Sequence, residues 1–428
     1  MRTLAAGVVA AGLLVTAPGQ ATPDGWQPQR TVVTGSAAQD LRPLGIAVNG
    51  FGRSYVLYTC GQGAVCGRYQ RVDGRLGAWH RLFSRRTAPP VEDIDVALGD
   101  TGRATIVWTS DDGAVLARRA SRQGWTSDAV EVGPPGASGG REQILRMQTD
   151  GDLEILWRPP EPWVWSYRQL RADDSLTDAP VRVEGQVFDV DLVDQTLAVV
   201  AVDQAQTLRF SKLSDGAVLG EPTVVDEGTD RIVPSAAVSM EGGGDAVVVW
   251  RAVVGNQSTV SSRHLPAVGD PSETYRLEGP RRGPYSLDLV RTGRGLRAAY
   301  MVGGELWGRR LTDQGASAGE ATLLQRRYFS QPARLHPMGG RVVFFHAKRG
   351  GRAPVLVRSW DGRRAVLREG PVLTEPEYRD LSGDRSALVV AQAGRHLAAA
   401  VGWRMPRTVD WPGWSRVKSV VNDPRAGS

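Results

Sequence analysis

The chain has very little cysteine and histidine, and this scarcity limits the chemistry that it can carry. Only two cysteines and five histidines occur among its 428 residues. The histidines stand apart, without the short spacings that metal-ligand motifs show. The sequence therefore predicts no metal site, no cofactor and no catalytic residues.

Long runs of one kind are missing as well. Beyond the N-terminus no segment approaches the roughly 18 consecutive apolar residues that a transmembrane helix needs. The 52 basic and 46 acidic residues are spread along the chain, and the basic ones form no stripe or tail. This distribution argues against a nucleic-acid partner.

The first residues match an export signal. Arg2 precedes an apolar stretch over residues 4–15, and small residues follow up to Ala21. This order predicts a secretory signal peptide over residues 1–21, with a buried N-terminal helix as the alternative. We therefore expect a soluble, secreted monomer outside the cytoplasmic membrane.

The two cysteines are close together in the sequence. Five residues that include two glycines separate Cys60 from Cys66, which suits two strands facing each other across a tight hairpin. In an oxidising compartment such a pair favours a disulfide. We expect this disulfide to add little global stability, because the loop that it closes is short.

A strand pattern recurs along the chain with a period of about 47 residues. Each unit contains a hydrophobic segment that reads as the second strand of a four-stranded sheet. The eight segments are residues 55–58, 105–108, 154–157, 198–201, 247–250, 297–300, 342–345 and 387–390. A repeat of this length, built from short strands, is typical of propeller blades.

Predicted third strands that end in arginine recur with the same period. These arginines are Arg68, Arg118, Arg263, Arg309 and Arg358. Asp-Gly type turns follow, as at Asp73-Gly74 and Asp361-Gly362, and supply the positive φ that tight hairpins require. The arginines have two interpretations, a basic belt for anionic glycans or side chains that join neighbouring blades.

We predict an all-β protein, a β-propeller of eight four-stranded blades over residues 22–421, with seven blades as the alternative and a C-terminal tail at 422–428. One such sheet cannot bury both faces alone, whereas sheets standing side by side in a closed ring can. A parallel β-helix would need rungs of about half this length. Residues 26–33 and 414–420 both read as fourth strands, and one of them should close the ring by strand pairing.

The pattern resembles the non-WD β-propellers of exported bacterial proteins, including sialidase-like folds. The resemblance covers nearly the whole mature chain, but only in strand order and spacing. Residues 109–113, Thr-Ser-Asp-Asp-Gly, are similar to the Asp-box turn of those propellers, although the usual aromatic residue is missing. The motif also falls between a second and a third strand. The resemblance implies a fold and not a function.

Aligning the predicted first strands gives one position per blade at the channel. This position reads Ala47, Asp95, Arg146, Asp191, Ala237, Asp288, Arg334 and Asp380. Charges among apolar neighbours are costly to bury unless they are paired. We therefore predict a charged ring in which each arginine bridges carboxylates of the two adjacent blades. It serves either as a set of ties between blades or as a funnel for a polar ligand.

These features favour a secreted, non-catalytic propeller that binds a glycan, a cell-envelope polymer or a protein partner through one face. The alternative is a polysaccharide-acting hydrolase or lyase with its site at the channel mouth, but the sequence defines no pair of catalytic carboxylates. Four tryptophans lie near predicted loops and are candidates for stacking on a sugar: Trp79, Trp125, Trp411 and Trp414.

Overall fold

The computed structural model describes the chain between residues 30 and 421, with gaps. The described residues are 30–36, 41–60, 64–84, 86–87, 89, 94–139, 142–228, 231–281, 287–302, 304–326, 335–338, 341–347, 355–363, 365–366, 384–393, 396–405 and 414–421. Every regular element among them is a β-strand. This part of the chain contains no helix with the length and hydropathy needed to span a membrane. The predicted signal peptide and C-terminal tail lie outside it.

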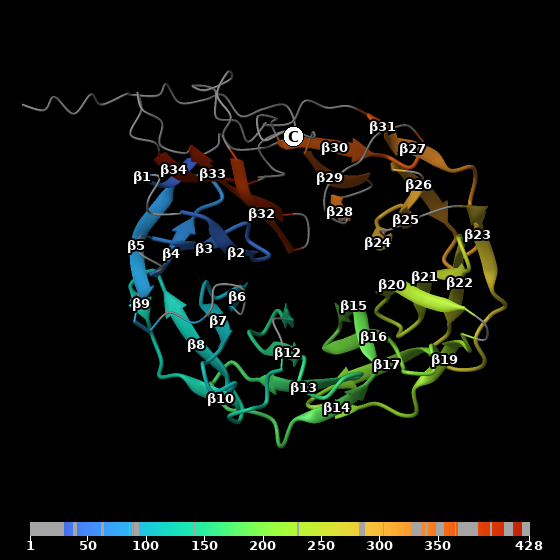
Figure 1. Ribbon diagram of the computed structural model, residues 1–428, viewed down its shortest axis with the longest axis horizontal. Helices are drawn as coiled ribbons and strands as arrows, with labels where there is room; N and C mark the ends of the chain where they lie inside the picture. Colours follow the sequence, from blue (N-terminus) through green and yellow to red (C-terminus); the bar gives the residue numbers. More distant parts are fainter. Residues whose placement is uncertain are drawn as a thin grey trace, which may run out of the picture.

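The described strands form eight sheets, each with a path of four antiparallel strands, and the sheets follow one another around a common centre (Figure 1). The innermost strands are β2 (Pro43–Val48), β6 (Ile94–Leu98), β11 (Gln143–Met147), β15 (Gln186–Val193), β20 (Ile232–Met240), β24 (Leu287–Thr292), β28 (Leu335–Met338) and β32 (Asp384–Ala393). The second strands are β3 (Ser54–Thr59), β7 (Ala104–Thr109), β12 (Leu153–Trp157), β16 (Thr196–Val202), β21 (Ala246–Val254), β25 (Gly295–Val302), β29 (Arg341–Ala347) and β33 (His396–Met405).

The outer half of each sheet completes the arrangement. The third strands are β4 (Val65–Gln70), β8 (Val115–Ser121), β13 (Val164–Leu170), β17 (Leu208–Ser214), β22 (Gln257–Leu265), β26 (Glu305–Leu311), β30 (Val355–Trp360) and β34 (Trp414–Val421). The fourth strands are β5 (Leu76–Phe83), β10 (Val130–Gly133), β14 (Val181–Glu184), β18 (Ala217–Val218), β23 (Tyr275–Arg281), β27 (Thr322–Gln325), β31 (Ala365–Val366) and β1 (Arg30–Ser36). Two short strands, β9 (Gly124–Trp125) and β19 (Thr223–Asp226), pair with β8 and β17.

The second strands are apolar throughout because both of their faces are covered. Every residue of β3, β7 and β12 is buried, whereas β5 at the outer edge is mostly exposed or partly exposed. A strand that is buried on both faces reads as a continuous apolar run instead of an alternating one. This difference made the second strands visible in the sequence.

Seven of the eight predicted second strands are confirmed, and the last is wrong. Residues 387–390 lie in β32, which is the innermost strand of its sheet, and β33 is the second strand. The last unit is longer than the earlier ones, so a fixed period reaches the preceding strand. Both strands are apolar, and hydropathy alone did not separate them.

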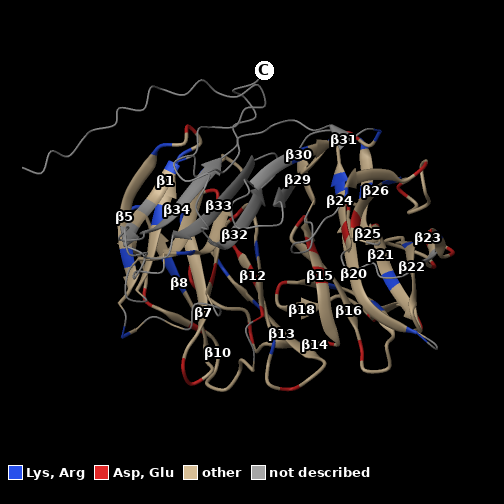
Figure 2. Cartoon of the chain, turned by 45° about the horizontal axis from the view of Figure 1, so that its top comes forward, with Lys and Arg blue, Asp and Glu red and all other residues tan. Residues whose placement is uncertain are grey.

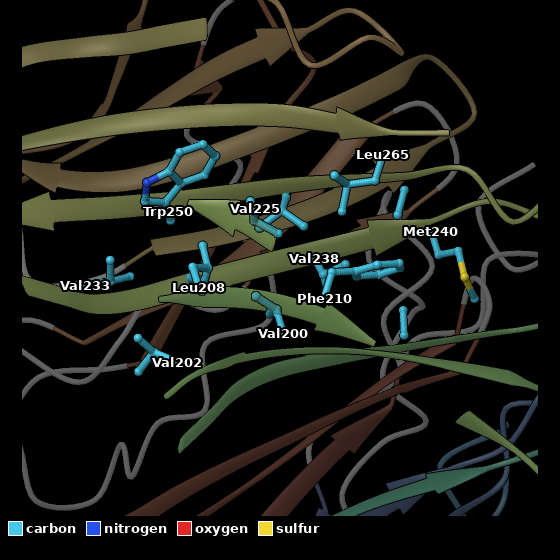
Figure 3. Packing of buried hydrophobic residues seen from close by; sticks show 14 of the residues in the cluster. Val200, Val202, Leu208, Phe210, Val225, Val233, Val238, Met240, Trp250 and Leu265 are labelled. Atoms are coloured by element: carbon cyan, nitrogen blue, oxygen red, sulfur yellow. The ribbon is translucent and has the colours of Figure 1, made fainter. Parts of the chain in front are cut away.

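The apolar cores lie between neighbouring sheets. One core joins β16 and β17 to β20 and β21, and includes Phe210, Val238 and Trp250 (Figure 3). The indole nitrogen of Trp250 donates to the carboxylate of Asp226 at 2.9 Å, so the one polar atom of this side chain is satisfied. Equivalent clusters occur at other boundaries between successive sheets. The stacking that the repeat predicts is therefore how the described sheets bury their faces.

The N-terminal and C-terminal strands share one sheet. β1 pairs with β34 in antiparallel register, and β34 pairs with β33. Residues 26–33 were predicted as a fourth strand, and β1 has that position. The prediction of a fourth strand for residues 414–420 is wrong, because β34 is the third strand. Val32 on β1 is buried with Ile46 and Val56 of the next sheet.

The predicted disulfide is confirmed. Cys60 and Cys66 are bonded across the turn between β3 and β4, with their Cα atoms 5.7 Å apart. The turn glycines Gly74 and Gly362 have φ of 78° and 95°, as the Asp-Gly turns require.

Candidate functional site

The predicted charged ring falls on innermost strands. Its described members are Asp95 on β6, Arg146 on β11, Asp191 on β15 and Asp288 on β24. Each of these side chains is partly buried. Arg334 and Asp380 lie outside the described residues. The alignment that selected Asp380 counted β32 as a second strand, so this position does not correspond to the others.

Two of these aspartates accept hydrogen bonds from backbone amides of the next sheet. Asp191 accepts the Met240 amide at 2.8 Å, and Asp288 accepts the Leu335 amide at 2.5 Å. In both cases the carboxylate belongs to one innermost strand and the N–H to the following one. Burial raises the pKa of Asp191, although the Met240 amide and the charge of Arg146 act to lower it. These contacts favour the interpretation as ties between sheets.

Arg146 crosses the same kind of boundary. Its guanidinium donates to the Val190 carbonyl on β15 at 3.2 Å. Asp95 accepts the amide of Val96 at 2.7 Å, and its carboxylate lies 3.4 Å from where a Cβ on Gly45 of β2 would stand. That each arginine bridges carboxylates on both sides stays a prediction.

Third-strand arginines also join sheets. The guanidinium of Arg68 donates to the carbonyl of Gly77 in its own sheet at 2.8 Å and to that of Val32 on β1 at 2.5 Å. Arg168 likewise donates to the carbonyls of Thr177 and Val132. Arg263 donates to those of Ser272 and Val225. Arg358 donates to the carbonyl of Leu324 in the preceding sheet. These bonds favour the packing interpretation over a basic belt. Figure 2 shows acidic residues in several of the turns that connect the strands.

Two of the four candidate tryptophans, Trp79 and Trp125, have different surroundings. Trp411 lies outside the described residues, and Trp414 begins β34. Trp125 packs edge-on against Phe83, with ring centroids 5.4 Å apart, and Arg118 lies over its ring. Its indole nitrogen donates to the Leu82 carbonyl at 3.0 Å, so Trp125 is a packing residue. Trp79 on β5 is 54% exposed and stays a candidate for surface contacts.

A cavity of about 480 Å³ opens next to the positions of Arg146 and Asp191. It lies between the turn after β11 and the turn after β15, at the boundary of the β11–β14 and β15–β18 sheets. Its described lining consists of Met147, Gln148, Thr149, Leu192, Asp194 and Gln195. Met147 and Leu192 directly follow Arg146 and Asp191 in the chain. The cavity therefore lies at the same end of β11 and β15 as Arg146 and Asp191.

The turn after β15 gives the cavity a fixed rim. Asp194 and Gln195 have φ of 47° and 64°, the left-handed pair that a two-residue hairpin turn uses. The side-chain amide nitrogen of Gln195, Nε2, donates to the Asp150 carboxylate at 3.2 Å. This hydrogen bond connects the two turns. The carboxylate of Asp194 lies 2.6 Å from where a Cβ on Gly242 would stand, so a side chain at Gly242 would collide with it.

A buried carboxylate stands behind the cavity wall. Glu154 on β12 has no exposed surface. It accepts hydrogen bonds from the Tyr167 hydroxyl at 2.6 Å, from the Gln169 amide at 3.1 Å and from the Gln148 amide. Burial raises the pKa of Glu154 more than these hydrogen bonds lower it. The network holds Gln148 in place at the cavity.

Sequence reasoning missed Glu154 and Arg168. Glu154 does not recur among the blades, and the available signal was a lone carboxylate inside an otherwise apolar second strand. Arg168 was missed because the residue three before it is Trp165, whereas the pattern required a branched aliphatic residue. A pattern that allowed any apolar residue would have included it.

Four-stranded antiparallel sheets arranged side by side around a centre define a β-propeller. No protein-family model matches the sequence, and no curated protein matches it. Solved structures do match in fold. The BP39L lectin from Burkholderia pseudomallei has a TM-score of 0.53 at 12% identity, over 80% of this chain and 100% of the lectin. The WD40 domain of SCAP from fission yeast has a TM-score of 0.51 at 8% identity, over 94% and 98%.

A third similar structure is an ulvan lyase from a new family of polysaccharide lyases. Its TM-score is 0.44 at 10% identity, over 80% of this chain and 97% of the lyase. At these identities the likeness to solved structures shows the fold alone. The chain is a β-propeller.

Proposed function

We propose that this protein is an exported, non-catalytic β-propeller that binds carbohydrate in the cavity between the β11–β14 and β15–β18 sheets. The observation that carries the proposal is the cavity itself, whose volume of about 480 Å³ falls in the range of ligand sites. Four of its six described lining residues have polar side chains, which are able to hydrogen-bond to a ligand. The fold that the chain shares with a lectin supports this choice.

The contacts of the charged ring support binding over catalysis. Glycoside hydrolysis commonly needs two carboxylates on either side of the scissile bond. Asp191 and Asp288 accept backbone amides of the neighbouring sheets, and Asp194 is the only carboxylate among the described lining residues. The ring therefore acts as a set of ties between blades in this proposal.

The same proposal includes a closed ring of eight blades with β1 as the closing strand. Val32 on β1 accepts from Arg68 just as Val132 on β10 accepts from Arg168 in a sheet further along the chain. β1 thus has the contacts of a fourth strand in a preceding blade.

The proposed export of the protein rests on residues 1–21, which resemble a signal peptide. The Cys60–Cys66 disulfide agrees with an oxidising compartment.

Carbohydrate binding is tested with the purified protein on an array of bacterial and plant glycans, with product release measured on the same samples. We expect binding with dissociation constants between about 1 mM and 1 μM and no new reducing ends or unsaturated products after prolonged incubation. Accumulating product would favour the hydrolase or lyase alternative. Absence of binding to every glycan would contradict the proposal.

A further inference from the structure

We infer that this cavity selects a hydroxyl-rich saccharide unit without acidic groups, and that Gln148 and Asp194 accept its hydrogen-bond donors. The inference rests on the carbohydrate-binding function proposed above. It follows from the juxtaposition of an amide oxygen that is open to the cavity and a free carboxylate on two walls of one cavity.

The buried carboxylate of Glu154 fixes the orientation of the Gln148 side-chain amide. Gln148 is only 6% exposed, and its Nε2 donates to the carboxylate of Glu154. Because Tyr167 and Gln169 also donate to this carboxylate, Glu154 acts as an acceptor and requires the nitrogen end of the amide. The Oε1 of Gln148 is therefore the end left over for the cavity.

That oxygen has no hydrogen-bond partner among the described residues. Although little of Gln148 is exposed, its Oε1 is not one of the buried polar atoms that lack a partner, so this oxygen is accessible from the cavity. Since Gln148 lines the cavity, this oxygen is open to a donor from water or from a ligand that occupies the cavity. A hydroxyl or amino group of a ligand supplies it.

Asp194 adds a second acceptor and the charge. Its side chain is exposed, and within the described part of the chain its carboxylate has neither a hydrogen-bond nor an ion-pair partner. The turn that carries it is held by the Gln195–Asp150 bond and by the Ser214 hydroxyl, which donates to the Gln195 carbonyl at 3.0 Å. Asp194 is the one charged residue of the described lining, so it repels an anionic ligand.

The remaining lining fits the body of a sugar ring. Met147 and Leu192 provide apolar surface for its C–H groups, and the Thr149 hydroxyl can donate or accept. With acceptors in excess, the ligand has to be rich in donors. Neutral sugars and amino sugars meet this condition, whereas uronates and sulfated sugars bring acceptors and negative charge.

The selection is tested by calorimetric titration of the full-length protein with trisaccharides. The neutral probes are those of glucose, galactose, mannose and N-acetylglucosamine; the cationic probe is that of glucosamine, and the anionic probe is that of galacturonate. We expect the best neutral or cationic trisaccharide to bind at least about tenfold more tightly than galacturonate, a difference of about 1.4 kcal/mol. Galacturonate binding as tightly as every other probe would overturn the inference.

Substitutions then test whether Gln148 and Asp194 are responsible for this binding preference. Gln148→Met keeps the size of the side chain and removes the amide oxygen, and should weaken the best probe about tenfold or more. Asp194→Asn lies in an exposed turn and should bring galacturonate to within about threefold of the best probe. Asp270→Asn makes the same charge change in the exposed turn after β22 and should match the parent protein. Thermal unfolding of each variant checks that it is folded.

The outcomes separate this inference from the proposed function. If probes bind but Gln148→Met and Asp194→Asn both behave like Asp270→Asn, carbohydrate binding stands and the assignment to this cavity is overturned. If no probe binds and the glycan array is also negative, both are overturned. If the array is positive for acidic glycans only, the function stands and the selectivity is wrong.

Discussion

Replacing Arg119 with methionine is expected to lower the free energy of unfolding by about 3–5 kcal/mol. The Arg119 side chain is 3% exposed and lies on β8, where it reaches the next sheet. It pairs with Asp174 and donates to the Arg171 carbonyl at 2.6 Å. It also donates to the Thr105 hydroxyl at 3.3 Å and to the Gly151 carbonyl at 3.4 Å. Methionine would fill much of the space but leave these groups without their donor.

Equilibrium unfolding in urea measures this loss, and Arg75→Met provides the matched control. The Arg75 side chain is 76% exposed, and its Nε lies 3.8 Å from the Asp73 carboxylate. An exposed pair of this kind contributes about 0–1 kcal/mol, so the control should unfold close to the parent protein. Equal unfolding midpoints for the two variants would contradict the role assigned to Arg119 as a tie between sheets.

Replacing Val32 with aspartate should also cost about 3–5 kcal/mol or abolish cooperative folding. Val32 is 2% exposed and packs on Ile46 and Val56, at the boundary between the sheet that holds β1 and the next sheet. A carboxylate there loses its hydration among apolar side chains, and the neighbouring Arg68 guanidinium already donates to the carbonyls of Val32 and Gly77. The large effect is expected only if β1 truly serves as the fourth strand of a blade that packs against β2–β5.

Thr31→Asp is the control for this second variant. Thr31 precedes Val32 on the same strand and is exposed. It pairs with Lys418 of β34, whereas Val32 lies at a register shift in that pairing, so the control tests the strand without the buried boundary. We expect a change within about 1 kcal/mol, the span of strand propensities, measured by thermal and urea unfolding. Two variants with the same stability would show that β1 does not pack at this boundary.

Much of the architecture could be predicted from residue patterns because both faces of the second strands are covered. Apolar segments such as 105–108 and 247–250 were placed correctly, as were the third strands that contain Arg68 and Arg263, although β4 and β22 each run two residues beyond the arginine. The last sheet was misread because its strands are similarly apolar and its unit is longer. Position in a period cannot decide between two equally apolar strands, whereas strand pairing does.

The candidate site could be predicted only in part. The alignment identified Asp191 and Arg146 as partly buried charges on innermost strands, but their actual partners include the Met240 amide and the Val190 carbonyl. Backbone partners carry no sequence signal. The cavity is built by two turns about one period apart and by the buried Glu154, so its residues come together only when two sheets stand side by side.

The most direct test of the account is a crystal structure of the protein with its tightest-binding neutral trisaccharide. The account predicts ligand density between the β11–β14 and β15–β18 sheets, with a sugar hydroxyl within about 3.2 Å of the Gln148 Oε1 and another at the Asp194 carboxylate. Density at the exposed Trp79 instead, with the cavity holding only water, would contradict it.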